Sequence, residues 1–214
     1  SQQNKKSFQA FEDFDMSQCK PLGDTLIVKP YDRPTEIGGI IIPMEKKVDE
    51  VTKSIVVCVG PKCEKVKPGD VIFHSVFAGS PTAIGNKKYI IMRESDSVGD
   101  LFGIFTGERD IDIQPLASKI LLEWEEGTEE IGNTGLLRAV TYGSSKDRHY
   151  TGIILAVGPD IEDKENLAVG KRVFFDQFSG PERIDYDGKR YAFIEEKDVY
   201  CALPTRTEME VLSA

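Results

Sequence analysis

The stretch GDVIFHSVFAG at residues 69–79 recurs as GKRVFFDQFSG at residues 170–180. Each copy begins with a glycine, continues through a short apolar run and ends in Phe-x-Gly. Self-similarity at a spacing of about 100 residues indicates an internal repeat rather than a chance match. Domains commonly contain about 100–150 residues, so a chain of 214 residues has room for two copies of one domain.

Three further pairs of segments keep the same order along the chain. They are KPLGDTLIVK (20–29) with QPLASKILLE (114–123), SIVVCVGP (54–61) with GIILAVGP (152–159), and KKYIIMRESDSVGDL (87–101) with KRYAFIEEKDVYCAL (189–203). The offset grows from 94 residues in the first pair to 102 in the last, which indicates small insertions in the loops of the second copy. We therefore expect domains at 20–104 and 113–204, with tails at 1–19 and 205–214.

Each copy has the sequence pattern of short strands. Its apolar runs are rich in β-branched residues and are bounded by turn sequences such as Gly60-Pro61 and Asp187-Gly188. This spacing leaves no room for βαβ units and predicts an all-β fold of two tandem small β-barrels. We expect subunit contacts at barrel edge strands, such as 25–28 and 98–102 in the first copy.

The composition excludes several classes of partner. Asp and Glu number 36 against 27 Lys and Arg, a net charge of −9, whereas phosphate binding needs a basic surface. No apolar run reaches the roughly 18 residues of a transmembrane helix, and the N-terminal segment lacks the apolar core of a signal peptide. We expect neither a nucleic acid nor a membrane as partner.

The cysteines are few and dispersed, which is typical of a reducing compartment. They are Cys19, Cys58, Cys63 and Cys201. Structural zinc usually needs two close pairs of Cys or His, and Cys58 and Cys63 have no matching second pair. No metal site is expected, and Cys58 is interpreted as a small buried residue of a strand.

The N-terminal tail carries Phe8, Phe11 and Phe14 at a spacing of three residues, which places them on one face of a helix. Two interpretations stay open: a loose tail, or a short amphipathic anchor that docks on a partner or a neighbouring subunit. The C-terminal tail is expected to be loose.

The first copy resembles the 10-kDa co-chaperonin (GroES-like) family. It contains, in the family's order, PLGDTLIVKP (21–30), IGGIIIP (37–43), VCVGP (57–61), VKPGDVIFHSVFAG (66–79) and YIIMRESDSVGDL (89–101). The second copy is more divergent but keeps PLASKILLE (115–123), TGLL (134–137) and VGKRVFF (169–175). The tandem doubling resembles the chloroplast-type double-domain form, and a phage-encoded relative fits the same motifs.

The resemblance implies two tandem GroES-like domains that cap an ATP-loaded chaperonin ring through mobile loops and assist protein folding. The partner would be a GroEL-type (60-kDa) chaperonin ring, and the co-chaperonin itself a homo-oligomeric ring. The first loop would contain Gly38, Gly39, Ile40, Ile41 and Ile42. Glycines keep a free loop flexible, and a ring of weakly binding loops gains affinity through avidity. The alternative for this segment is a buried strand, because Ile-Ile-Ile is also a good β sequence.

A second loop would contain Gly135, Leu136 and Leu137, followed directly by Arg138. Chaperonin binding and packing against a neighbouring domain both stay open for it. The resemblance implies no cofactor in this chain, because ATP is bound by the partner chaperonin. The expected compartment is the cytoplasm, with two alternatives: the plastid stroma after removal of a transit peptide, or the virion or infected-cell cytoplasm.

The sequence does not indicate an enzyme. It lacks the Gly-x-Gly-x-x-Gly turn of a nucleotide-binding domain, and its two histidines, His74 and His149, lie in dissimilar contexts. Adjacent glutamates such as Glu195-Glu196 would point to opposite faces of a strand. No catalytic residues are expected. The alternative function is a structural or virion assembly protein, for example a capsid-associated one, that reuses the fold without chaperonin docking.

Overall fold

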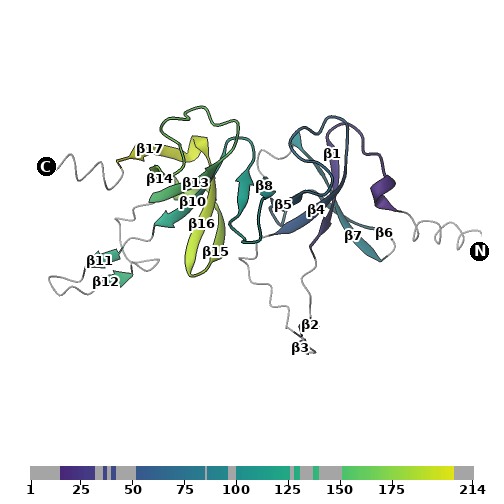
Figure 1. The fold of residues 1–214 in the computed structure, drawn as a ribbon, viewed down its shortest axis with the longest axis horizontal. Coiled ribbons are helices and arrows are strands. Elements are labelled where there is room, and N and C mark those ends of the chain that lie inside the picture. Colours follow the sequence, from purple (N-terminus) through teal and green to yellow (C-terminus); the bar gives the residue numbers. More distant parts are fainter. Residues whose placement is uncertain are drawn as a thin grey trace, which may run out of the picture. The chain divides into compact units, whose positions relative to one another are not determined.

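The computed structural model describes residues 15–31, 36–37, 40–41, 52–84, 86–95, 100–125, 128–130, 137–139 and 151–204. The chain divides into two compact units, Ser1–Leu116 and Ala117–Ala214. Over the described residues both units consist of β-strands and short 3-10 helices, without an α-helix (Figure 1). The all-β fold class is therefore confirmed. The domain limits 20–104 and 113–204 stay predictions.

The first unit is built on one antiparallel sheet of seven strands. In spatial order these are β6 (Ser80–Ile84), β7 (Lys87–Arg93), β1 (Thr25–Pro30), β4 (Lys53–Val59), β5 (Val71–His74), β8 (Leu101–Phe105) and β9 (Ile113–Pro115). A two-stranded sheet of β2 (Glu36–Ile37) and β3 (Ile40–Ile41) is separate from it. The 3-10 helix η1 (Met16–Gln18) precedes β1.

The second unit repeats this order with six strands. They are β15 (Glu182–Tyr186), β16 (Lys189–Glu195), β10 (Lys119–Glu125), β13 (Thr151–Val157), β14 (Arg172–Phe175) and β17 (Val199–Leu203). A separate two-stranded sheet joins β11 (Thr128–Glu130) to β12 (Leu137–Ala139). The 3-10 helices η4 (Gln177–Ser179) and η5 (Glu196–Asp198) lie on either side of the β15–β16 hairpin in the sequence.

The expectation that residues 25–28 form an edge strand is wrong. Strand β1 pairs with β4 on one side and with β7 on the other. Its residues Leu26, Ile27 and Val28 are all buried, as in a strand covered on both faces. The last strand of the first copy starts at Leu101 rather than at 98, and it too has neighbours on both sides.

The two units match residue by residue around the first central strand. Gly23 and Ala117 both adopt a positive φ, of 60° and 51°. The N–H of Gly60 donates to the Thr25 carbonyl at 2.7 Å, and that of Gly158 donates to the Lys119 carbonyl at 2.8 Å. Residue 60 has to be glycine, because a Cβ there would lie 2.2 Å from the Gly23 carbonyl oxygen. These positions keep an offset of 94 to 98 residues.

The register of the last strands corrects the offset of 102 residues that the sequence predicts for the pair 87–101 and 189–203. His74 pairs with Leu101 across a β-bulge, and Phe175 pairs with Val199 across an equivalent bulge. Leu101 therefore corresponds to Val199, an offset of 98 rather than 102. The reason is length: seven residues separate β7 from β8, whereas three separate β16 from β17.

Each sheet encloses its own apolar core. The first core includes Leu26, Val28, Val56 and Ile72, and the second includes Ile120, Leu122, Ile154 and Val173. Full burial of such a side chain stabilises the fold by about 1.5–3 kcal/mol. A third cluster packs Met16 of η1 against Ile27, Tyr89 and Cys58, so this part of the N-terminal tail lies on its own unit. Phe8, Phe11 and Phe14 lie outside the described residues.

Cys58 is buried in β4, as predicted, and burial raises the pKa of its thiol to about 11. A thiol with this pKa stays protonated and unreactive at neutral pH. It acts as a small apolar residue of the core.

A buried polar pair distinguishes the first core from the second. His74 is 1% exposed, and its Nε2 lies 2.7 Å from the Ser54 hydroxyl. Its Nδ1 lies 2.8 Å from the Ser75 carbonyl, which can only accept, so Nδ1 carries the proton and Nε2 accepts from Ser54. Burial lowers the pKa of His74, because the charged imidazolium is poorly solvated there.

The second unit fills the equivalent space with apolar groups. Phe175 stands where the first unit has His74, and Gly152 stands where it has Ser54. A Cβ on Gly152 would lie 2.6 Å from Leu122 Cδ1 and 2.9 Å from the Glu123 carbonyl oxygen, so any larger residue would force the backbone to shift. The larger ring of Phe175 and the missing side chain of Gly152 compensate in volume.

We predict that His74 makes the stability of the protein depend on pH. Its pKa in the native state is lowered, so below the unfolded-state value of about 6.5 the unfolded chain binds a proton that the native state does not. Stability is therefore lost as the pH falls below about 6.5, by at most about 1.4 kcal/mol per pH unit. Denaturant unfolding at pH 7.5, 6.5 and 5.5 measures this loss.

The double variant Ser54→Gly/His74→Phe, which copies the second unit, should lose less stability over this range than the parent. His74→Gln, which keeps a donor for the Ser75 carbonyl, serves as a second variant if the first folds poorly. An unchanged pH dependence in both variants would contradict this role for His74.

Candidate functional site

Each unit has one long connection between two neighbouring strands. Residues 31–52 join β1 to β4, and residues 126–150 join β10 to β13. In the sheet, Pro30 pairs with Ser54 and Glu125 pairs with Thr151, so each connection leaves and re-enters its sheet at one place. These two connections contain all the site residues predicted from the sequence.

In the first connection the structure describes part of the predicted site. Ile40 and Ile41 form β3, and their register partners in β2 are Ile37 and Glu36. Gly38, Gly39 and Ile42 lie outside the described residues. Two residues, Gly38 and Gly39, separate the paired positions in the sequence, and Gly-Gly is among the pairs favoured in two-residue hairpin connections. Ile40 and Ile41 thus pair in a small hairpin and not in the main sheet.

The second connection has a related arrangement with a longer turn. Leu137 begins β12 and is paired with Glu130 of β11, and Arg138 is paired with Glu129. Gly135 and Leu136 lie outside the described residues. Six residues, 131–136, separate the paired positions here instead of two. The sequence match between the two connections is correspondingly weaker.

An ion pair and an aromatic ring hold the sheet where the first connection returns. Lys53 Nζ lies 2.6 Å from Asp110 Oδ1 and 4.4 Å from the centroid of the Phe105 ring. The second connection departs beside a similar group, with Arg172 Nε 2.6 Å from Glu125 Oε2 and Arg183 5.0 Å from the Trp124 ring. Partly exposed ion pairs contribute at most about 1 kcal/mol each, so their role is to fix the strand ends.

The described residues offer little for metal or acid–base chemistry. Over that part of the chain, no group of three or more His, Cys, Asp or Glu side chains is arranged to hold a metal ion. The Cys63 thiol, 3.6 Å from the Thr25 carbonyl, donates to it instead. His74 is buried and already bonded to Ser54 and Ser75.

No helix among the described residues is long and apolar enough to cross a membrane.

Sequence reasoning missed two exposed aromatic residues that occupy equivalent positions. Phe77 and Phe178 are each 86% exposed. In both turns a side chain accepts a hydrogen bond from the Phe N–H: Ser75 Oγ for Phe77 at 3.2 Å, and Asp176 Oδ1 for Phe178 at 2.8 Å. The repeated Phe-x-Gly motif could have indicated these positions, but an apolar residue that recurs in a repeat is usually interpreted as part of the hydrophobic core.

Comparison with known proteins decides the family. The sequence profile described as chaperonin 10 Kd subunit matches this chain twice, over residues 18–100 and 112–203. The chain belongs to the chaperonin 10 kDa subunit family. The two matched segments confirm the tandem repeat found in the sequence.

Relatives of two sizes share this family. The 20 kDa chloroplastic chaperonin of Arabidopsis thaliana is 28% identical over 202 residues, which cover 87% of this chain and 76% of the relative. That of Spinacia oleracea is 25% identical over 201 residues, with the same coverage. The co-chaperonin GroES of Elusimicrobium minutum is 36% identical over 87 residues, 37% of this chain and 90% of the relative.

These similarities support a co-chaperonin function in a tandem double-domain form. Nothing in them supports the alternative of a structural or virion assembly protein. Co-chaperonins are generally not enzymes, and they act together with a chaperonin.

Proposed function

We propose that this co-chaperonin caps a chaperonin ring of the GroEL (60-kDa) type, and that the first connection is the contact. The observation that carries the proposal is the separate β2–β3 hairpin, in which Ile40 and Ile41 lie apart from the seven-stranded sheet. In the sequence, TEIGG precedes the isoleucine triplet and the charged segment MEKKVDEVTK follows it. An apolar triplet in a polar connection fits a groove on another protein.

We propose that the chain works as a homo-oligomeric ring. One short apolar segment binds weakly, because it must lose conformational entropy when it docks. Several segments held in one assembly raise the affinity through a high effective concentration. A modest weakening of each contact is then enough for the co-chaperonin to dissociate from the chaperonin.

We further propose that the chain needs no cofactor and catalyses no reaction. The ATP that controls capping would be bound by the chaperonin. Its compartment would be that of its chaperonin, either the cytoplasm or the plastid stroma. Similarity to both chloroplastic and bacterial co-chaperonins fits each of these.

The first prediction concerns the isoleucine triplet. The variant Ile40→Ser/Ile41→Ser/Ile42→Ser should lose nucleotide-dependent co-elution with the host chaperonin in size-exclusion chromatography, because its apolar contact is removed. Lys46→Ser/Lys47→Ser in the same connection is the matched control and should still co-elute. Circular dichroism and thermal unfolding should show native folding in both variants. A complex of parental strength with the triple variant would disprove the contact.

The second prediction separates the two interpretations of the second connection. If Leu136 and Leu137 contact the chaperonin, Leu136→Ser/Leu137→Ser should weaken the complex by about tenfold or more and leave the thermal midpoint unchanged. Some binding should persist, because the first connections stay intact. A lowered midpoint with unchanged chaperonin affinity would instead show that these leucines pack within the co-chaperonin.

A further inference from the structure

Three consecutive residues fix the end of the first connection where it returns to the sheet. The Thr52 carbonyl accepts a hydrogen bond from the His74 N–H at 3.2 Å, and the Lys53 carbonyl accepts one from the Tyr31 N–H at 3.0 Å. The Ser54 hydroxyl donates to the His74 imidazole within the core. The place at which the connection re-enters the sheet is therefore set by these three residues.

The side chain of Lys53 contacts the turn between β8 and β9. Its Nζ lies 2.6 Å from Asp110 Oδ1 and 4.4 Å from the centroid of the Phe105 ring. The Phe105 ring contacts Phe73, with centroids 6.3 Å apart, and Phe73 is buried. The ammonium group thus has a carboxylate partner and an aromatic partner, and the aromatic partner packs on the core.

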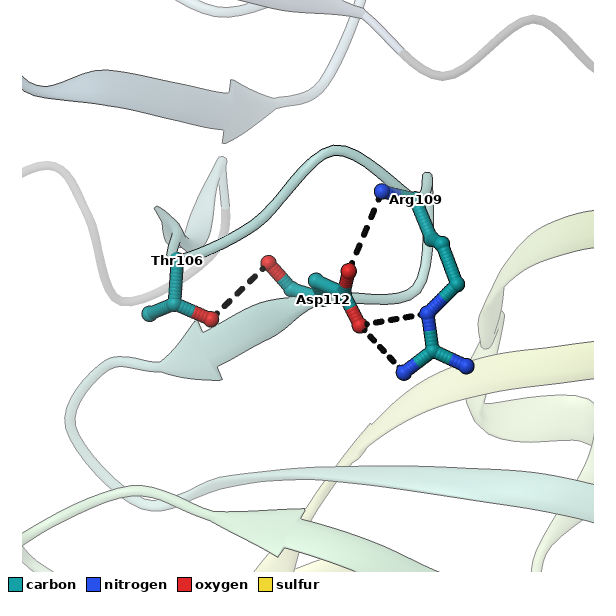
Figure 2. A network of polar contacts seen from close by, with 3 residues as sticks. All are labelled: Thr106, Arg109 and Asp112. Atoms are coloured by element: carbon teal, nitrogen blue, oxygen red, sulfur yellow. Dashed lines mark hydrogen bonds and ion pairs between the residues drawn. The ribbon is translucent and has the colours of Figure 1, made fainter.

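The turn that carries Asp110 is closed by its own polar contacts (Figure 2). The hydroxyl of Thr106 donates to the Asp112 carbonyl at 3.2 Å. The carboxylate of Asp112 accepts from the N–H, Nε and Nη2 of Arg109 at 3.0, 2.9 and 2.6 Å. Asp110 stands between Arg109 and Asp112 in the sequence, so its position does not depend on the contact with Lys53.

The second unit has neither the lysine nor the aromatic ring. By the register of the two sheets, Thr151 corresponds to Lys53, and Leu203 corresponds to Phe105. A hydroxyl and an aliphatic side chain form neither an ion pair nor a cation–π contact. The Lys53 contacts are thus specific to the unit whose connection carries the isoleucine triplet.

The ion pair of the second unit holds the other end of its connection. Glu125 is the last residue of the departing strand β10, and its Oε2 lies 2.6 Å from Arg172 Nε. In the first unit the ion pair holds the returning strand β4, and Asp110 comes from the segment that leads into the second unit.

We propose that Asp110 positions Lys53, and with it the returning end of the first connection, for docking on the chaperonin. Both are positioning residues that act through the connection. A connection whose end is already fixed in the free protein loses less conformational entropy when it docks. The segment between the two units thereby takes part in chaperonin binding. This inference rests on the proposed function, because it concerns the same contact.

The effect on one connection is small, and the assembly amplifies it. A partly exposed ion pair contributes little, so its loss should favour opening of the strand end by only about two- to fivefold. When several connections dock together, the changes in their separate affinities multiply. Loss of the ion pair should therefore weaken the complex with the chaperonin by about tenfold or more, although each chain stays folded.

Hydrogen exchange in the free chain tests, without a chaperonin, whether Asp110 holds the strand end. In Asp110→Asn, the N–H groups of Tyr31 and His74, which donate to the returning end, should exchange about two- to fivefold faster in NMR spectra. The N–H of Leu116, just beyond β9, donates to a carbonyl of β8 and should exchange as in the parent. Unchanged exchange at Tyr31 and His74 would overturn the proposal.

The affinity for the host chaperonin, measured at a fixed nucleotide concentration, tests the consequence. Asp110→Asn should weaken the complex by about tenfold. Glu123→Gln is the matched control and should bind like the parent. It also changes a carboxylate to an amide and removes an ion pair, with Lys189 at 2.9 Å, and Glu123 is 31% exposed against 29% for Asp110.

Two kinds of failure are distinguishable in this measurement. Parental affinity of Asp110→Asn, while the isoleucine triple variant loses binding, would overturn the positioning role alone. Parental affinity of the triple variant would instead overturn the proposed chaperonin contact, and the positioning role with it.

A double-mutant cycle shows whether Asp110 acts through Lys53. Lys53→Thr, which copies the second unit, should weaken the complex about as much as Asp110→Asn. The double variant Lys53→Thr/Asp110→Asn should bind no more weakly than either single variant, because both remove the same ion pair. Losses that multiply in the double variant would show that Asp110 acts elsewhere, and would overturn the proposal.

Discussion

The rest of the structure depends on the central strand of each unit, which is paired on both edges and carries fully buried side chains. Strand β1 is paired on both edges, and Leu26 and Val28 of this strand are fully buried. Strand β10 holds the same place in the second unit, with Ile120 and Leu122 fully buried. Both long connections start where these strands end. The apolar segment proposed to contact the chaperonin therefore lies outside the main sheet but follows directly from a strand that is paired on both edges.

The repeat preserves backbone geometry more strictly than side chains. Glu94 accepts hydrogen bonds from the N–H groups of Glu64, Lys65 and Val66, at 2.8 to 3.2 Å. Glu196, at the equivalent position, accepts from the N–H groups of Glu162 and Asp163. In both units one glutamate thus ties the turn that follows the Val-Gly-Pro segment to the end of the neighbouring strand, through hydrogen bonds to charged acceptors that are stronger than neutral ones. Ser54 and His74 have no such constraint, and the second unit replaces them with glycine and phenylalanine of compensating volume.

The sequence predicted the repeat, the strands and the family, because each depends on local patterns: turn residues, short apolar runs and their order. It misplaced 25–28 at a sheet edge, because a strand's own residues do not say which distant strands pair with it. It also missed β9, since Ile113-Gln114-Pro115 is short and contains a proline. That strand exists because Leu116 enters the core and Asp112 closes the preceding turn.

The segment that leads from the first unit to the second contributes the strand β9 to the first unit's sheet. In the first unit, the strand added to β8 belongs to the same chain, so its pairing costs little association entropy and is closed by the Thr106–Asp112 turn. The Thr106 hydroxyl donates to the Asp112 carbonyl, and the Asp112 carboxylate accepts from the Arg109 N–H and guanidinium. These contacts close the turn locally, so β9 reaches its register on β8 without a long loop, and the entropy cost of closing a short loop is small.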